Sequence, residues 1–223
     1  MDYRHECKFL ISRDTAWLLQ QQLPCLMQRD SHAGEDGIYT IRSLYFDDPA
    51  FTAFHDKVAG VDDRTKYRIR CYNYSDSLFR LEKKEKKGDL TRKTGEILPK
   101  DQVQALENNS LLPGEPGSLI EELRLLCTCK GVRPVVLVDY DRTSFVCHAG
   151  NTRITLDDHL RTLPYCRHIG DSHHAMIPVM DPDQVILEIK FDEYLPGYLG
   201  AYFRDLPKIS MAVSKFALCL QLI

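Results

Sequence analysis

The chain has 223 residues, of which 43% are hydrophobic and 27% charged, and its formal net charge at pH 7 is -3. This length is enough for one sizeable core, so we expect a single domain of mixed α and β structure over residues 1–223. The near-neutral charge excludes a uniformly basic protein, and any site for a polyanion must therefore be a local concentration of Lys and Arg.

The N-terminal sequence MDYRHECKFL is charged from its start, and no apolar run approaches the roughly 18 residues that span a membrane. We therefore expect a cytoplasmic protein without a transmembrane segment. The chain has eight cysteines, most of them scattered singly through predicted strands and helices. This spacing favours reduced thiols over a disulfide framework.

The first predicted elements alternate between strand and helix. Residues 3–11 predict a strand, because charged residues alternate with a more apolar face. Its charged face holds Arg4, Glu6 and Lys8. Residues 12–23 are typical of a helix. We expect this helix to bury Trp17, Leu18 and Leu23. Residues 39–48 alternate again and predict a second strand, and residues 49–58, opened by Pro49, suit a short helix.

Two charged strands follow, joined by a short turn. Every second residue of the first is polar and mostly basic: Lys66, Arg68, Arg70 and Tyr72. The second repeats this pattern with Arg80, Glu82, Lys84 and Lys86. Successive side chains of a strand point to opposite faces, so each strand has one charged face. A returning strand over residues 88–98 carries Arg92 and Lys93.

The remaining chain predicts two helices, a long hairpin and a last charged strand. Residues 99–109 and 117–131 are helical, and the second helix begins with a capping box of Ser118 and Glu121. Residues 133–160 predict a hairpin with its turn at 149–151. Its charged faces hold Tyr140 and Arg142 on one strand and Arg153, Thr155 and Asp157 on the other. In the strand predicted over residues 183–194, Glu188, Lys190 and Asp192 alternate with apolar residues.

These patterns together predict about eight strands, each with one charged and one apolar face. The apolar stripes of the helices need a surface to pack on, and the apolar faces of the strands supply it. The charged faces must then line the interior of a closed sheet, which is tolerable only if an anion and water fill it. The predicted fold class is therefore α+β: an eight-stranded antiparallel β-barrel tunnel with a polar lumen and helices packed outside.

Eight segments also resemble a known family. They occur in the order and spacing of the VTC domain, the polyphosphate polymerase module of the vacuolar transporter chaperone family, which belongs to the triphosphate tunnel metalloenzymes and is related to the CYTH domains. The resemblance covers essentially the whole chain, from residue 3 to about residue 217. The segments are RHECKFLI, SLYFDD, KYRIRCY, LEKKEKKGDLTRK, DYDRTSF, RITLDDHL, ILEIKFD and SKF.

This resemblance implies a polyphosphate polymerase that transfers the γ-phosphate of ATP onto a growing chain, assisted by Mn²⁺ or Mg²⁺. ATP and inorganic polyphosphate are the implied partners. The residues that correspond to catalytic positions are Arg68, Arg70, Lys84, Arg142, Arg153 and Lys215. The residues assigned to substrate binding, which include further members of the charged strand faces, are Lys8, Lys66, Lys86, Lys93, Tyr140 and Tyr45. Glu188 corresponds to the metal-binding glutamate.

Some assignments stay open at this stage. Many relatives carry a second basic residue two positions after the one that Lys93 resembles, where this chain has Gly95, so either Lys93 or Arg92 faces the tunnel. Glu6 and Glu82 either assist the metal or pair with Lys8 and Lys84 and so hold the rotamers of these lysines. Eukaryotic family members also carry an SPX domain and membrane helices that this sequence does not show, and a membrane partner for the product stays open.

Two other functions fit the same residues. A tunnel triphosphatase or polyphosphatase would use the same basic cage and metal, with water as the acceptor. The SLYFDD and SKF segments favour the polymerase, as does the first strand, which reads Arg4, Glu6, Lys8 where CYTH hydrolases have a Glu-x-Glu-x-Lys pattern. A non-catalytic polyanion-binding module is the third hypothesis. We expect no nucleic acid, because Tyr72 and Tyr74 do not form a sustained aromatic pattern.

Overall fold

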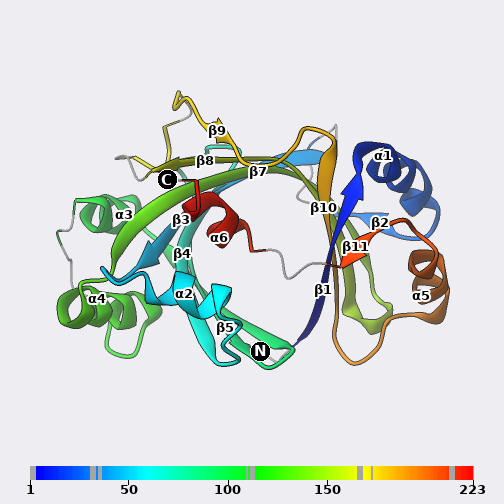
Figure 1. Ribbon diagram of the computed structural model, residues 1–223. Coiled ribbons are helices and arrows are strands. Elements are labelled where there is room, and N and C mark those ends of the chain that lie inside the picture. The colour runs from blue at the N-terminus through cyan, green and yellow to red at the C-terminus, as the bar shows by residue number, and fades with distance from the viewer. Residues whose placement is uncertain are drawn as a thin grey trace.

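The structure is a computed structural model and describes residues 4–30, 34, 37–108, 110, 114–164, 168–171, 173–210 and 214–222. Its central feature is a closed antiparallel β-barrel (Figure 1). Around the barrel the strands follow one another in the order β7 (Arg133–Cys147), β3 (Ile38–Asp47), β4 (Arg64–Tyr72), β5 (Phe79–Lys87), β6 (Leu90–Leu98), β1 (Arg4–Ser12), β10 (Gln184–Phe191) and β8 (Thr152–Pro164). The pairing of β8 with β7 closes the ring.

The seam between β1 and β6 is narrow. Among the described residues, Arg4 pairs there with Thr91 and His5 with Leu90, and β1 then runs on beside β10. The β7–β8 pair is the long hairpin expected at the sequence level, with the short 3-10 turn η2 (Ala149–Asn151) between its strands. Three two-residue strands lie at the margins of the sheet: β2 (Gln28–Arg29), β9 (Ile177–Pro178) and β11 (Ile209–Ser210).

In the described part of the chain, four helices cover the outside of the barrel: α1 (Arg13–Gln22), α3 (Lys100–Glu107), α4 (Leu119–Lys130) and α5 (Gly197–Arg204). The apolar faces of the strands pack against them in two clusters. In the first, Leu44 and Ile69 of the barrel join residues of α3 and α4. In the second, Leu187 packs with Leu19 of α1 and Phe203 of α5. The predicted eight-stranded antiparallel barrel with helices outside is thus confirmed.

The helix starts follow their capping residues. Ser118 accepts a hydrogen bond from the backbone N–H of Glu121 at 3.3 Å, as its capping box predicts, and Ser12 caps α1 in the same way. The prediction of buried Trp17 and Leu18 in α1 is wrong, because these side chains are 59% and 48% exposed. The helix turns Thr15, Ala16 and Leu19 toward the sheet, and the 3-10 turn η1 (Leu23–Cys25) that follows it buries Leu23.

The C-terminal helix α6 (Lys215–Leu220) differs from these four, because it packs against the inner face of the barrel (Figure 1). Phe216 is 1% exposed and stacks on Tyr45 of β3, with ring centroids 5.0 Å apart. Val138 of β7 and Leu160 of β8 belong to the same apolar cluster. The short helix α2 (Thr52–Val58) contacts both α6 and β4. One part of the interior is therefore apolar and filled by the chain itself.

Within the described segments, none of the helices has the length and apolar character needed to cross a lipid bilayer.

Candidate functional site

The remaining interior of the barrel is lined by charge. Because the apolar residues of each strand face the outer helices, the residues at alternate positions face inward. These inward residues include the charged faces predicted from the sequence, and all eight barrel strands contribute to them. They form three connected groups, each centred on a buried carboxylate: Glu188, Glu82 and Glu6.

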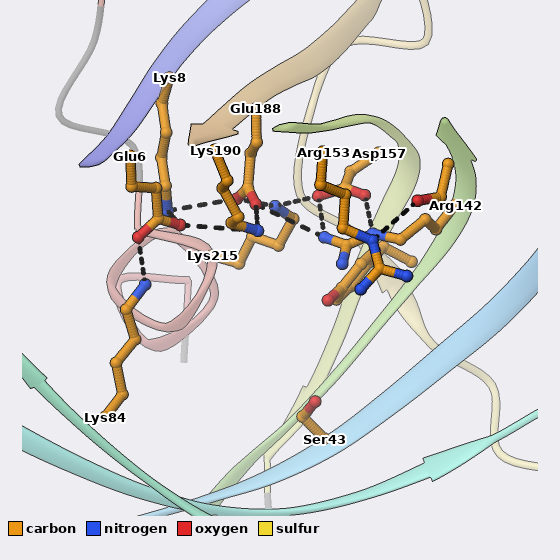
Figure 2. Close-up of polar contacts among 12 residues, drawn as sticks. Glu6, Lys8, Ser43, Lys84, Arg142, Arg153, Asp157, Glu188, Lys190 and Lys215 are labelled. Atoms are coloured by element: carbon orange, nitrogen blue, oxygen red, sulfur yellow. Dashed lines mark hydrogen bonds and ion pairs between the residues drawn. The ribbon is translucent and has the colours of Figure 1, made fainter. Parts of the chain in front are cut away.

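Glu188 on β10 is surrounded by cations (Figure 2). Its exposed fraction is 4%. Four basic nitrogens lie around its carboxylate: Lys190 Nζ at 2.6 Å, Lys215 Nζ at 3.0 Å, Lys8 Nζ at 3.2 Å and Arg142 Nη2 at 3.6 Å. Burial opposes ionisation of Glu188, but the attraction of these cations keeps its pKa well below the ordinary value. The residue is therefore ionised and heavily paired.

Asp157 on β8 extends this group. Arg142 donates two hydrogen bonds to its carboxylate, from Nε at 2.6 Å and Nη2 at 2.7 Å, and Lys215 Nζ lies 2.5 Å from Oδ2. The sequence placed Asp157 on the charged face of its strand but gave it no role. The sequence pattern could have indicated this role, because a carboxylate at an inward position among so many cations is expected to pair with one of them.

Glu82 on β5 is the centre of the second group and is fully buried. Arg68 donates to it from Nε at 2.8 Å, Lys93 Nζ lies at 2.7 Å, and Arg70 Nη1 at 3.8 Å. Lys93 therefore faces the interior, whereas Arg92 pairs with Glu85 on the other face of the sheet. This answers the question left open by Gly95. Glu82 thus pairs with Arg68 and Lys93, whereas Lys84, one of the two lysines expected as partners, pairs with Glu6.

Glu6 on β1 joins the remaining lysines. Lys84 Nζ lies 2.6 Å from Glu6, Lys8 Nζ 3.6 Å and Lys190 Nζ 3.8 Å (Figure 2). Lys8 and Lys190 thus bridge the Glu6 and Glu188 groups. Lys190 was not among the predicted site residues, although it shares the charged face of its strand with Glu188.

Two predicted tyrosines hold arginines in position. Tyr45 accepts a hydrogen bond from Arg68 at 2.8 Å, and Tyr140 accepts one from Arg70 at 3.0 Å. Arg70 is 5% exposed and also donates to Ser43. These hydroxyls fix the guanidinium groups without neutralising them. The charge of Arg68 is paired with Glu82, whereas that of Arg70, 3.8 Å from the same carboxylate, is more available to a ligand.

Arg153 lies toward the edge of the site. Its side chain is 38% exposed, donates to Ser144 Oγ at 3.1 Å and forms an ion pair with Asp30. In register it is the neighbour of Lys190. Unlike Arg142, it does not contact any of the three buried glutamates among the residues that the structure describes.

Lys66 and Lys86 occupy inward positions on β4 and β5. Lys66 donates to Ser214 Oγ at 3.1 Å, and its ammonium lies 4.7 Å from the ring centroid of Phe216. Burial, followed by repulsion from Lys8 and Lys84, lowers the pKa of Lys66 to about 6. Burial also lowers the pKa of Lys84 to about 8, although Glu6 partly offsets the effect. Both ammonium groups therefore favour an environment with more negative charge than the protein supplies.

The donors in this interior are compatible with a hard divalent cation. No group of three or more His, Cys, Asp or Glu side chains forms a metal site in the described part of the chain. Mg²⁺-like ions, however, are held by one or two carboxylates, with phosphate and water as the other ligands. Glu188 and Glu6 supply two ionised carboxylates on paired strands, and they share Lys8 and Lys190 as partners. These two residues fit such an ion.

The geometry suits a linear polyanion. The interior cations come from strands on every side of the barrel and outnumber the carboxylates that pair with them. Arginines present a planar fork that matches phosphate oxygens, and lysines act as mobile point charges. A chain of phosphates fits this distribution better than a single small anion, which a few of these cations would already neutralise.

A comparison with models of protein families shows that the VTC domain model matches residues 3–223, which is nearly the whole chain. A comparison with curated protein sequences found none that matches. Among solved structures, a Hippeastrum protein described as having a dominant triphosphatase activity is 17% identical, with a TM-score of 0.60, and 98% of this chain aligns with 95% of that one.

Two other solved structures share the fold. A candidate adenylate cyclase from Bacillus halodurans has a TM-score of 0.54 at 18% identity, with 92% of this chain and 87% of that chain covered. The protein PH1819 from Pyrococcus horikoshii has a TM-score of 0.54 at 13% identity, with 99% and 100% covered. At these identities the likeness concerns the fold, and it confirms the tunnel architecture.

Proposed function

This chain belongs to the VTC domain family, and on that premise we propose that it is a polyphosphate polymerase, which transfers the γ-phosphate of ATP onto a growing polyphosphate chain. The observation that carries the proposal is the charged interior of the barrel, where Lys and Arg side chains from many strands converge. Phosphoryl transfer requires mainly the positioning of phosphates and the neutralisation of charge on their oxygens. The interior offers both.

In this proposal the arginines bind the reacting phosphates. Arg68 and Arg70 are held by Tyr45 and Tyr140, and each keeps N–H groups for phosphate oxygens beyond its contacts in the protein. Arg142 is oriented by Asp157 through two hydrogen bonds. Lys8, Lys84 and Lys215 provide point charges around the same path, and Lys93 does so from β6.

Glu188, together with Glu6, would hold a divalent cation, for which Mg²⁺ and Mn²⁺ are the candidates. Such an ion, when bound, neutralises phosphate charge as the leaving group departs. The protein's own contribution is to keep both carboxylates ionised, which the surrounding lysines do by lowering their pKa.

The inner carboxylates are poorly suited to activate a water molecule for hydrolysis. Hydrolysis needs a group that takes a proton from the attacking water, whereas the terminal oxygen of a phosphate chain is already anionic. Glu6, Glu82, Asp157 and Glu188 all have lowered pKa values, because neighbouring cations outweigh the effect of burial. Ion-paired carboxylates of this kind are weak general bases.

Hydrolysis of triphosphate is the alternative function. The Hippeastrum protein, which has the same fold, is described as a triphosphatase. Water and a phosphate chain would meet the same cations, so the two functions differ only in the acceptor.

One assay separates these functions. The pure protein is incubated with ATP and either Mg²⁺ or Mn²⁺, and the products are resolved on a gel into long-chain polyphosphate and orthophosphate. We expect a ladder of long chains that Arg68→Ala reduces strongly. Lys87→Gln, an exposed change at the end of β5, is the control and should leave the ladder unchanged. Orthophosphate without any chains would establish hydrolysis and overturn the polymerase.

A further inference from the structure

The outer surface that α1 and α5 form is largely uncharged. Residues 15–28, which include most of α1, and residues 194–203, which include most of α5, contain no Asp, Glu, Lys or Arg, although these types make up 27% of the chain. Several apolar and aromatic side chains in the two segments are exposed: Trp17, Leu18, Leu26, Tyr194 and Tyr198. Exposed apolar groups that gather in this way mark an interaction surface.

The two segments lie side by side on one flank of the barrel (Figure 1). At one end, the hydroxyl of Tyr202 in α5 donates to Gln22 in α1 at 2.5 Å. At the other end, β2, which follows α1, pairs with Val146 of β7, and Tyr198 contacts the neighbouring Cys147 at 3.3 Å. The exposed side chains therefore form a continuous surface. We call it the α1–α5 face and define it by Trp17, Leu18, Gln22, Leu26, Tyr198 and Tyr202.

Packing of the barrel does not account for these side chains. The buried side of α1 includes Ala16 and Leu19, and that of α5 includes Leu199 and Phe203, so the α1–α5 face lies on the opposite side of both helices. A single exposed apolar residue needs no explanation. Adjacent Trp, Leu and Tyr side chains, however, are typical of the centre of a protein–protein interface, which has a polar rim. Charged residues lie at the margin of this face: Asp14, Arg29 and Arg204.

The distribution of charge favours a second copy of this chain as the occupant. Interior cations outnumber the carboxylates that pair with them, so the outer surface is more acidic than the net charge of -3 indicates. Two copies therefore repel each other through most of their outer surfaces. At the α1–α5 face this repulsion is weakest, because neither copy brings a charge to its centre. An anionic membrane is instead attracted through Lys and Arg, which both segments lack.

We propose that the α1–α5 face is a homodimer interface, at which two copies meet through the same face about a two-fold axis. The inference is independent of the catalytic assignment. A two-fold arrangement closes the assembly, because each copy uses its face once. Two adjacent helices about 15 Å long and together about 20 Å wide cover roughly 300 Å². A standard interface buries about 800 Å² per partner, so this dimer is weak and reversible.

Dimerisation at this face would act on the strands of the candidate site. α1 follows directly on β1, which carries Glu6, and α5 follows β10, which carries Glu188, after a short loop. A docked copy adds contacts to both helices and binds only the folded form, so it stabilises this side of the barrel by mass action. The melting temperature should therefore rise with protein concentration in the wild type.

The test uses Trp17, the only tryptophan of the chain, which reports on this face alone. Sedimentation equilibrium and tryptophan emission are measured on the full chain from low to high micromolar concentration. We expect the mean mass to rise from that of one chain toward that of two, and the emission maximum to move to shorter wavelength over the same range, because the indole leaves water.

Two variants place a carboxylate on each copy at the interface. Leu18→Glu should weaken dimerisation at least about tenfold, because like charges then face each other, and Leu26→Glu should do the same from the other end of the face. Both side chains are exposed, so the fold should be retained. Leu125→Glu makes the same change at a similarly exposed position of α4 and is the matched control, which should leave mass and emission as in the wild type.

A wild-type chain that stays monomeric throughout this range would overturn the inference. A dimer whose Trp17 emission does not change, or that both variants leave intact, would overturn it as well, because the copies would then meet elsewhere. Neutral and anionic phospholipid vesicles test the other occupant: an emission shift on vesicles by a chain that is monomeric in solution would assign the face to a membrane. Polyphosphate synthesis is a separate readout, so failure of the proposed function is distinguishable from failure of this inference.

Discussion

At the scale of single residues, Glu188 illustrates how the charged interior is held together. Its carboxylate is the common partner of Lys8, Lys190, Lys215 and Arg142. The resemblance implied a metal ligand at this position. The contacts add a structural role, because removing one partner from a buried ion-pair network leaves the remaining charges uncompensated.

We therefore expect Glu188→Gln to abolish activity and also to destabilise the empty protein, by about 3 kcal/mol. A bound polyanion supplies negative charge to the same cations, so triphosphate should restore most of the lost stability. Urea denaturation with and without triphosphate measures both effects. Glu193→Gln, an exposed change on the same segment, is the control and should alter neither. Unchanged stability in Glu188→Gln would show that the network does not depend on this carboxylate.

The lowered pKa of Lys66 predicts how the stability of the empty protein depends on pH. In the unfolded chain a lysine stays protonated to about pH 10, whereas in the folded protein burial lowers the pKa of Lys66 to about 6. Between these values the unfolded state binds more protons, so the stability of the empty protein rises as the pH rises from about 6 to 9. Lys84 and Lys93, whose pKa values burial lowers to about 8, act in the same direction over the upper part of this window.

Groups of the opposite kind act outside this window. Against the effect of burial, Glu188 and Glu6 raise the pKa of Lys8, and Asp157 and Glu188 raise that of Lys215, so the stability these lysines contribute is lost only above the ordinary lysine pKa. Neighbouring cations lower the pKa of Glu188 and Glu6, so these glutamates lose their contribution only at acid pH. Urea denaturation at several pH values checks the slope. Lys66→Met, which removes the charge, should show a clearly smaller slope, and saturating triphosphate should flatten the wild-type curve. A wild-type stability that falls from pH 6 to 9 would contradict the assignment.

At the scale of elements, α6 connects the apolar and charged parts of the interior. Phe216 stacks on Tyr45 and lies beneath the ammonium of Lys66, and the adjacent Lys215 reaches Asp157 and Glu188. Packing of the helix therefore sets the position of Lys215.

Truncation of Phe216 to Ala should lower the free energy of unfolding by about 3 kcal/mol, because it leaves a cavity where a fully buried aromatic ring packed. Activity should fall further than the folded fraction, since Lys215 and Lys66 lose their support. Leu222→Ala changes a side chain that is 52% exposed and should stay within about 0.5 kcal/mol of wild type. Denaturation curves and assays of both variants are the measurement. Equal losses in the two would mean that α6 does not pack inside the barrel in solution.

The strands were predictable from sequence because their period of two is a local property. Alternation at Lys66, Arg68 and Arg70 needs no knowledge of the rest of the chain, and it gave the inward faces correctly. Helix α1 was predicted, but with the wrong face toward the core. Its pattern suggested that Trp17 and Leu18 are buried, whereas the buried residues are Thr15, Ala16 and Leu19. Helices α5 and α6 were not predicted, although Ser214 is an N-cap signal before an apolar segment.

The partnerships across the barrel were not predictable. The pairing of Arg142 with Asp157, or of Lys93 with Glu82, depends on the register between strands and on closure of the sheet. Such long-range geometry leaves no signature in a single segment. The pairing of Arg153 with Asp30 was likewise not readable from the sequence, which only counted Arg153 among the catalytic residues that the resemblance implies. The roles of these residues in catalysis stay predictions.

At the scale of the whole molecule, repulsion among the interior cations opposes folding of the empty barrel. The chain is slightly acidic overall, yet its interior collects cations from most of the barrel strands and leaves several of them without carboxylate partners. Mutual repulsion of these cations disfavours the empty folded state. A ligand that carries many negative charges in a row relieves this repulsion and binds only the folded form, so it stabilises the protein by mass action.

We expect the melting temperature to rise with the number of phosphates in the ligand, from orthophosphate through triphosphate to long-chain polyphosphate, at equal ionic strength. Differential scanning fluorimetry measures the shift. Arg70→Ala should reduce the shift for triphosphate, because it removes a guanidinium whose remaining contacts are hydroxyls and a distant carboxylate. Arg70→Lys, which keeps the charge but loses the fork, should give an intermediate shift. Because orthophosphate at matched ionic strength screens charge equally well, a dependence on chain length isolates the linear array of sites from general screening. A shift that is the same for all three ligands, or that Arg70→Ala leaves intact, would mean that phosphate chains do not enter the barrel.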